Sequence, residues 1–171
     1  MEWSCPGPCI NCDAAIEKNY SVITAARDWR GGLVFALSKK ANTNVPLQAE
    51  AEALLWFVQL VGSFTGIKVV IEGDSKMCIE ALRTRNLDVP WRISSCLTEI
   101  CRLTSLLSDC SFIWVRREAN RAVHELATWS LQNHLIGSFD FGAGPPSLAN
   151  ILLDDYCRSN VYFFPTFRPQ M

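Results

Sequence analysis

The sequence predicts a single α/β domain in which helices cover a mixed β-sheet. Two observations lead to this class. Strand-like runs joined by short connectors fill residues 9–40, and from residue 45 onward helical runs alternate with short apolar strands. Short connectors indicate antiparallel hairpins, whereas strands reached through helices indicate parallel pairing. A chain of 171 residues with 49% hydrophobic residues is long enough to bury one core.

Three strands are expected first. Their apolar segments are CINCDAAI, YSVITAARD and LVFALSKK, over residues 9–16, 20–28 and 33–40. The connectors EKN and WRGG are short, and the second contains a glycine pair, which is typical of turns between antiparallel neighbours. These strands should therefore form an antiparallel meander.

The hydrophobic period changes after residue 44. Helices are expected at residues 45–64, 74–85, 91–108 and 119–133, and strands at residues 68–73 and 110–117. Pro46 suits the first turn of the first helix, and Gly62 marks its end. Asp74 and Ser75 form a capping pair before the second helix. The expected order is therefore β-β-β-α-β-α-α-β-α.

The chain is expected to divide into three parts. Residues 1–8 form an N-terminal extension, residues 9–134 form the domain, and residues 135–171 form a tail rich in glycine and proline. At most a short helix is expected in the tail, near SLANILLDDYC, whose apolar spacing also suits docking to a protein partner.

Charge and hydropathy limit the binding partners and the cellular compartment that we expect for this protein. A net charge of -1 and a pI of about 6.1 give no global sign of nucleic-acid binding, so any such surface must be local. The basic clusters are Arg27 with Arg30, Lys39 with Lys40, and Arg116 and Arg117 with Arg121, and each also suits a solvated face. No apolar run approaches the ~18 residues that cross a bilayer, and MEWSCPGP lacks the features of a signal peptide. We expect an intracellular monomer, in the nucleus or cytoplasm, without a membrane partner.

The eight cysteines are scattered through apolar segments, so we expect reduced thiols packed as small side chains. Cys5, Cys9 and Cys12 raise the alternative of a zinc site. However, Cys9 and Cys12 would point to opposite faces of one strand, and no second CxxC or HxxxH pair supplies the missing ligands. Zinc is therefore disfavoured.

Glu50 is a carboxylate at the centre of an apolar helical face. On a wheel of about 100° per residue, the residues within about 80° of it are Leu47, Leu54, Phe57, Val58 and Val61. A buried carboxylate costs several kcal/mol unless a cation or hydrogen bonds compensate it. Glu50 is thus a functional candidate, whereas Glu52 points the other way; the alternative is that Glu50 reaches water or an arginine.

Asp13 and Asp74 are two further candidates. Asp13 interrupts an apolar strand, and Asp74 follows KVVIEG at the edge of the sheet where α/β proteins bind ligands. An exposed strand end for Asp13 and a helix cap for Asp74 are the alternatives. A compact sheet would bring both beside Glu50, and three neighbouring carboxylates favour Mg²⁺ or Mn²⁺. Two such ions about 4 Å apart are the standard device for phosphodiester hydrolysis.

Five segments resemble the ribonuclease H family, type 1, and in particular plant ribonuclease H-like domains related to non-long-terminal-repeat retrotransposon polyproteins. They are INCDAAI, WRGGLVFALSKK, PLQAEAEALLWFVQL, VVIEGDSKMCIEAL and VRREANRAVHELATW. Their order and spacing match over residues 9 to about 130. The resemblance implies a five-stranded mixed sheet, with three antiparallel strands and then two parallel ones. It also implies a metal-dependent endonuclease that cleaves the RNA strand of RNA–DNA hybrids, with Asp13, Glu50 and Asp74 holding the metal.

His124 is where the chain departs from the family pattern. The family usually has an aspartate in a motif like NxxAD, and here the motif reads NRAVHELA. The family's histidine in the preceding loop has no counterpart in RREAN. On the helix wheel His124 lies at the edge of the core stripe, roughly 120° from its centre. We predict a catalytic role, as a proton shuttle or a ligand better suited to Mn²⁺; the alternatives are an idle boundary residue and a core residue.

Two functions stay open at this point. Three acids in register favour hydrolysis, with Arg116, Arg117, Asn120 and Arg121 contacting the nucleic acid. The near-neutral charge and the missing fourth carboxylate favour a catalytically weak or inactive nucleic-acid-binding module with the same fold.

Overall fold

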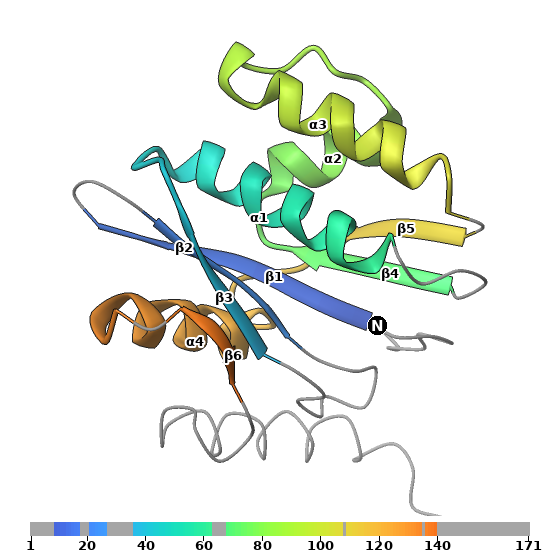
Figure 1. The fold of residues 1–171 in the computed structure, drawn as a ribbon. Coiled ribbons are helices and arrows are strands. Elements are labelled where there is room, and N and C mark those ends of the chain that lie inside the picture. The colour runs from blue at the N-terminus through green and yellow to red at the C-terminus, as the bar shows by residue number, and fades with distance from the viewer. Residues whose placement is uncertain are drawn as a thin grey trace, which may run out of the picture.

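The computed structural model describes residues 9–17, 21–26, 36–62, 68–107, 109–134 and 136–139. These residues form one six-stranded sheet with the strand order β5-β4-β1-β2-β3-β6 (Figure 1). The strands are β1 (Cys9–Ile16), β2 (Ser21–Ala26), β3 (Ala36–Ala41), β4 (Lys68–Gly73), β5 (Asp109–Trp114) and β6 (Gly137–Phe139). The helices are α1 (Pro46–Val61), α2 (Lys76–Thr84), α3 (Trp91–Thr104) and α4 (Arg121–Gln132).

The sheet is mixed, as predicted. Strand β2 pairs antiparallel with β1 and β3, whereas β4 pairs parallel with β1 and β5. The prediction of five strands is wrong by one edge strand. Strand β6 lies antiparallel to β3, with Ser38 opposite Gly137 and Ala36 opposite Phe139, beyond residue 134 where the domain was expected to end. Three residues are too short a strand to leave a periodic signal in the sequence.

Several element boundaries differ from the expected ones. Helix α3 ends at Thr104, with Ser105 as its C-cap, rather than at residue 108. Helix α2 begins at Lys76 and its N-cap is Ser75, so Asp74 is not the capping residue. The extension at residues 1–8, the cluster of Arg27 and Arg30, and the tail from residue 140 lie outside the described residues.

The helices divide between the two faces of the sheet. Helices α1, α2 and α3 lie on one face and α4 lies on the other (Figure 1). The main apolar cluster lies under α1, α2 and α3, and consists of Cys12, Ala14, Ala41, Ala49, Ala51, Ala53, Leu54, Phe57, Val58, Val61, Val69, Ile71, Cys78, Ile79, Ala81, Leu82, Ile93, Leu97, Ile100 and Phe112. Helix α4 packs on β1 and β2 through its own buried residues, Ala122, Val123, Leu126, Ala127 and Ser130. Within the described residues, no helix is both long and apolar enough to span a membrane.

Candidate metal centre

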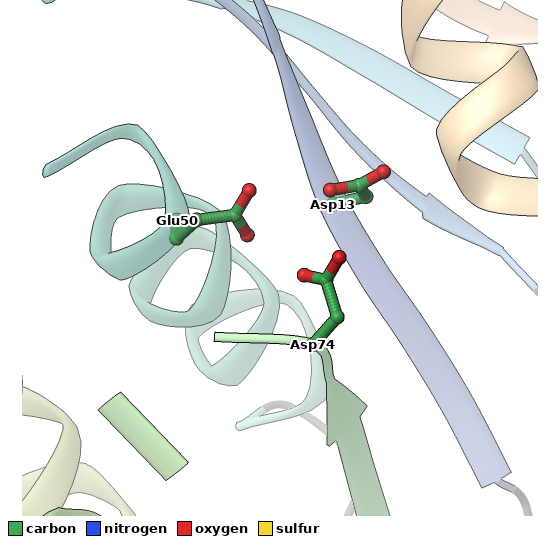
Figure 2. Close-up of side chains that lie close together, drawn as sticks. All are labelled: Asp13, Glu50 and Asp74. Atoms are coloured by element: carbon green, nitrogen blue, oxygen red, sulfur yellow. The ribbon is translucent and has the colours of Figure 1, made fainter. Parts of the chain in front are cut away.

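Three carboxylates meet where β4 ends beside β1. Asp13 comes from β1, Glu50 from α1 and Asp74 from the turn after β4 (Figure 2). One ligand oxygen of each lies within 4.8 Å of the others. Asp13 is almost fully buried, with 2% of its surface exposed, and the other two are half-buried. The structure thus brings together the three carboxylates that the sequence singled out.

The backbone explains why these three meet. Strands β1 and β4 are parallel neighbours, and Asn11 pairs with Glu72. Asp13 and Asp74 each follow two residues later, so Asp74 leaves the end of β4 beside Asp13, which is still within β1. Helix α1 packs across β1 and carries Glu50 near its N-terminal end, on the side that faces the sheet. The cluster therefore depends on strand register and helix phase together.

The electrostatics of this cluster favour a cation. Burial raises the pKa of Glu50 well above its usual range, and the charges of Asp13 and Asp74 raise it further. Burial and Asp13 also raise the pKa of Asp74, and Arg117 acts in the opposite direction. Burial also raises the pKa of the Cys12 thiol. Three carboxylates this close resist full ionisation unless a positive charge joins them.

Asp13 is held by two hydrogen bonds. Its Oδ1 accepts the backbone N–H of Ala14 at 2.8 Å, and its Oδ2 lies 2.8 Å from Nδ1 of His124. On the other side of the ring, Nη2 of Arg117 lies 3.1 Å from Nε2 of His124. A guanidinium only donates hydrogen bonds, so Nε2 accepts and Nδ1–H donates to Asp13. The contacts thus assign His124 to the neutral Nδ1–H tautomer.

His124 is placed beside the cluster rather than within it. Its side chain is 30% exposed, which fits the predicted boundary position. The hydrogen bond from Asp13 raises the pKa of His124, while burial and Arg117 oppose this. His124 does not belong to the group of carboxylates whose ligand atoms converge, and it contacts that group through its hydrogen bond with Asp13.

Asn120 fastens α4 to β1. Its Nδ2 donates to the backbone oxygen of Cys12 at 3.1 Å, and only 1% of the residue is exposed. Its Oδ1 has no hydrogen-bond partner within the described part of the chain. In this conformation the side chain of Asn120 offers no surface to a nucleic acid, although the sequence had assigned it one.

The basic residues that the sequence singled out are exposed where the structure describes them. Arg116, Arg117 and Arg121 are all exposed, in the segment that leads from β5 into α4. On β3, Lys39 and Lys40 are also exposed, and Nζ of Lys39 lies 6.0 Å from the centre of the Trp56 ring. Of these three arginines, Arg117 is linked to the carboxylates, because it contacts His124, which in turn contacts Asp13.

Trp114 is a site residue that the sequence analysis missed. Its indole Nε1 donates to the backbone oxygen of Asp74 at 3.0 Å, and the next residue, Val115, donates to the oxygen of Gly73 at 3.1 Å. The end of β5 thus fixes the turn that carries Asp74. An aromatic residue at the end of the strand next to β4 was the available signal, but strand order is needed to use it.

A mixed sheet with this strand order, helices on both faces and a carboxylate cluster at the end of β4 defines a ribonuclease H-like α/β protein. The chain matches the reverse transcriptase-like family over residues 11–130 and belongs to that family. A search of curated proteins found no match.

Solved structures agree on the fold. RNase H1 from the halophilic archaeon Halobacterium salinarum is 21% identical, with a TM-score of 0.65 over 74% of this chain and 98% of that one. LC11-RNase H1, isolated from compost, is 17% identical, with a TM-score of 0.66 over 76% of this chain and 99% of that one. LC11-RNase H1 in complex with an RNA/DNA hybrid is 16% identical, with a TM-score of 0.59 over 74% and 97%. At these identities the likeness establishes the fold alone.

Proposed function

We propose that this protein is a metal-dependent endonuclease that hydrolyses the RNA strand of RNA–DNA hybrids. The observation that carries the proposal is the convergence of Asp13, Glu50 and Asp74 within 4.8 Å. A protein of similar fold has been solved in complex with an RNA/DNA hybrid, which supports this substrate class.

The donor set fits a hard divalent cation. All three groups are carboxylates, and Mg²⁺ and Mn²⁺ prefer oxygen ligands. Such a cation, when bound, lowers the pKa of a water molecule and stabilises charge on the phosphate. The carboxylate cluster led us to predict two ions, but the contacts of His124 bear on that number.

The other residues of the site orient the ligands and attract the substrate. The N–H groups of Ala14 and His124 fix the carboxylate of Asp13, and Trp114 fixes the backbone at Asp74. Arg116 and Arg121 are exposed and supply positive charge for the phosphates of a hybrid. Fixed geometry of this kind is what a hydrolytic site needs.

The test compares hydrolysis of a labelled hybrid by the wild type and by Asp13→Asn, in Mg²⁺ and in Mn²⁺. We expect the variant to lose at least ~100-fold in rate, because it removes a direct ligand and even partners of ligands cost 10–100-fold. Glu52→Gln removes a carboxylate of the same helix outside the cluster and should keep full activity. Equal rates for the wild type and Asp13→Asn would refute the proposal.

A second candidate is a nucleic-acid-binding module without turnover. It is favoured by His124 at the position where the family usually has a fourth carboxylate. Binding of the hybrid by the wild type, with no cleavage in either metal, would select it. The monomeric state, the nuclear or cytoplasmic location and the relation to retrotransposons stay predictions.

A further inference from the structure

Both ring nitrogens of His124 are engaged. Nδ1–H donates to Asp13, and the lone pair of Nε2 receives a hydrogen bond from Arg117. A metal ligand needs a free nitrogen lone pair, and the neutral ring has only one. That lone pair is occupied by a group that is always protonated. His124 therefore supplies no ligand atom in this arrangement, and the site has three protein ligands rather than four.

Asp13 accepts a hydrogen bond on each of its two oxygens. Oδ1 accepts from Ala14 and Oδ2 from His124, both at 2.8 Å. A pair of ions sharing Asp13 would need one of them at Oδ2, on the side where His124 and Arg117 lie. Helix α4 provides no carboxylate there, because Asp13, Glu50 and Asp74 are the one group of possible ligands found within the described residues.

The charges of the site also favour one bound cation rather than two. Three ionised carboxylates are neutralised by one divalent cation together with Arg117. A second divalent cation would leave an excess of two positive charges beside the contact between Arg117 and His124. Like charges so close are disfavoured in a partly buried site.

We propose that the site binds one divalent cation, on Asp13, Glu50 and Asp74, and that Arg117, held against His124, takes the place of a second cation. This inference rests on the proposed metal-dependent function and specifies how the site departs from the two-ion arrangement. Arg117 and His124 act as positioning residues: they orient Asp13 and supply a fixed positive charge on its far side.

The test is the number of Mn²⁺ ions bound per chain, measured by electron paramagnetic resonance and by calorimetry without substrate. The wild type should bind one ion and show no coupling between ions. His124→Asp should bind two, with the spectrum of a coupled pair, because it frees Oδ2 of Asp13 and adds a carboxylate. Arg117→Met should also gain a second, weaker ion, whereas Arg116→Met, which changes the neighbouring exposed arginine, should still bind one.

The outcomes separate this inference from the proposed function. No Mn²⁺ bound by the wild type would refute metal dependence itself. Two ions bound by the wild type would overturn the inference while leaving metal-dependent hydrolysis intact. One ion in all of the variants would show that Arg117 and His124 do not exclude a second. If His124→Asp does not fold, as judged by circular dichroism, the wild type and Arg117→Met still decide the question.

Discussion

The two faces of the sheet are built differently. Under α1, α2 and α3 the contacts come from the main cluster of buried apolar side chains. Under α4, three buried or half-buried polar contacts join the helix to the sheet. They are Ser38 with Ser130 at 2.8 Å, Asn120 with the oxygen of Cys12 at 3.1 Å, and His124 with Asp13 at 2.8 Å.

The two kinds of contact have different effects: apolar burial stabilises the fold, and the hydrogen bonds fix the positions of side chains. Apolar burial contributes roughly 25 cal/mol per Å² and has no direction, so it holds α1 firmly without fixing each side chain. A hydrogen bond contributes only about 1 kcal/mol net, but it requires one geometry. The three polar contacts under α4 therefore add little to the stability that its buried Val123 and Leu126 provide, and they set the position from which His124 reaches Asp13.

Phe57→Ala tests the apolar face and should have the largest effect. Phe57 is fully buried in the main cluster, so the change removes a large side chain and leaves a cavity. We expect the free energy of unfolding to fall by about 3–5 kcal/mol, measured by urea denaturation. Gln59→Ala, at an exposed position of the same helix, should change it by less than about 0.5 kcal/mol. A loss below about 1 kcal/mol for Phe57→Ala would mean that this face is not the main source of stability.

The serine pair tests the polar face. Ser130→Ala leaves the hydroxyl of Ser38 buried without its partner, which should cost about 1–3 kcal/mol. The double variant Ser38→Ala with Ser130→Ala removes both hydroxyls and should be close to the wild type in stability. The same urea titrations measure this double-mutant cycle. If the double variant loses as much as the sum of the two single ones, the pair contributes by packing and not by its hydrogen bond.

The mixed sheet was predictable because its signals are local. Short apolar runs joined by short connectors mark β1 and β2, and the change to a helical period marks α1 at Pro46. Strand β6 was not predictable, because three residues carry no period and its partner β3 lies about a hundred positions away. Its position depends on tertiary contacts that no short window of sequence contains.

The carboxylates were predictable for the same reason, and their neighbours were not. Glu50 stands out because a helix wheel places it on the buried face, and Asp74 because it ends an apolar strand. The contacts of His124 with Arg117 and Asp13 span seven and 111 positions and depend on how α4 is rotated on the sheet. Trp114 acts on Asp74 across two adjacent strands, which requires the strand order to be known.

Glu50→Gln tests the cost of the carboxylate cluster, and its effect on stability should be the smallest of the three. The raised pKa of Glu50 means that the folded protein holds this proton more tightly than the unfolded chain does. Below the ordinary glutamate pKa of about 4.3, Glu50 is protonated in both states, and the variant should match the wild type. As the pH rises towards the raised pKa of the folded state, the wild type loses stability that the variant keeps. At pH 7 without divalent metal we expect the variant to be more stable by about 1 kcal/mol.

The control and the metal complete this test. Glu52→Gln removes a carboxylate on the other side of α1, where Gln48 donates to it at 2.9 Å, and it should give no such gain. Mn²⁺ should reverse the order of stability, because ligand binding stabilises the wild type and the variant lacks one of the three carboxylates. Thermal unfolding in EDTA and in Mn²⁺ measures both effects. If the wild type is as stable as Glu50→Gln at pH 7 in EDTA, the charges of the cluster do not destabilise the fold. The three carboxylates would then need no cation to compensate them.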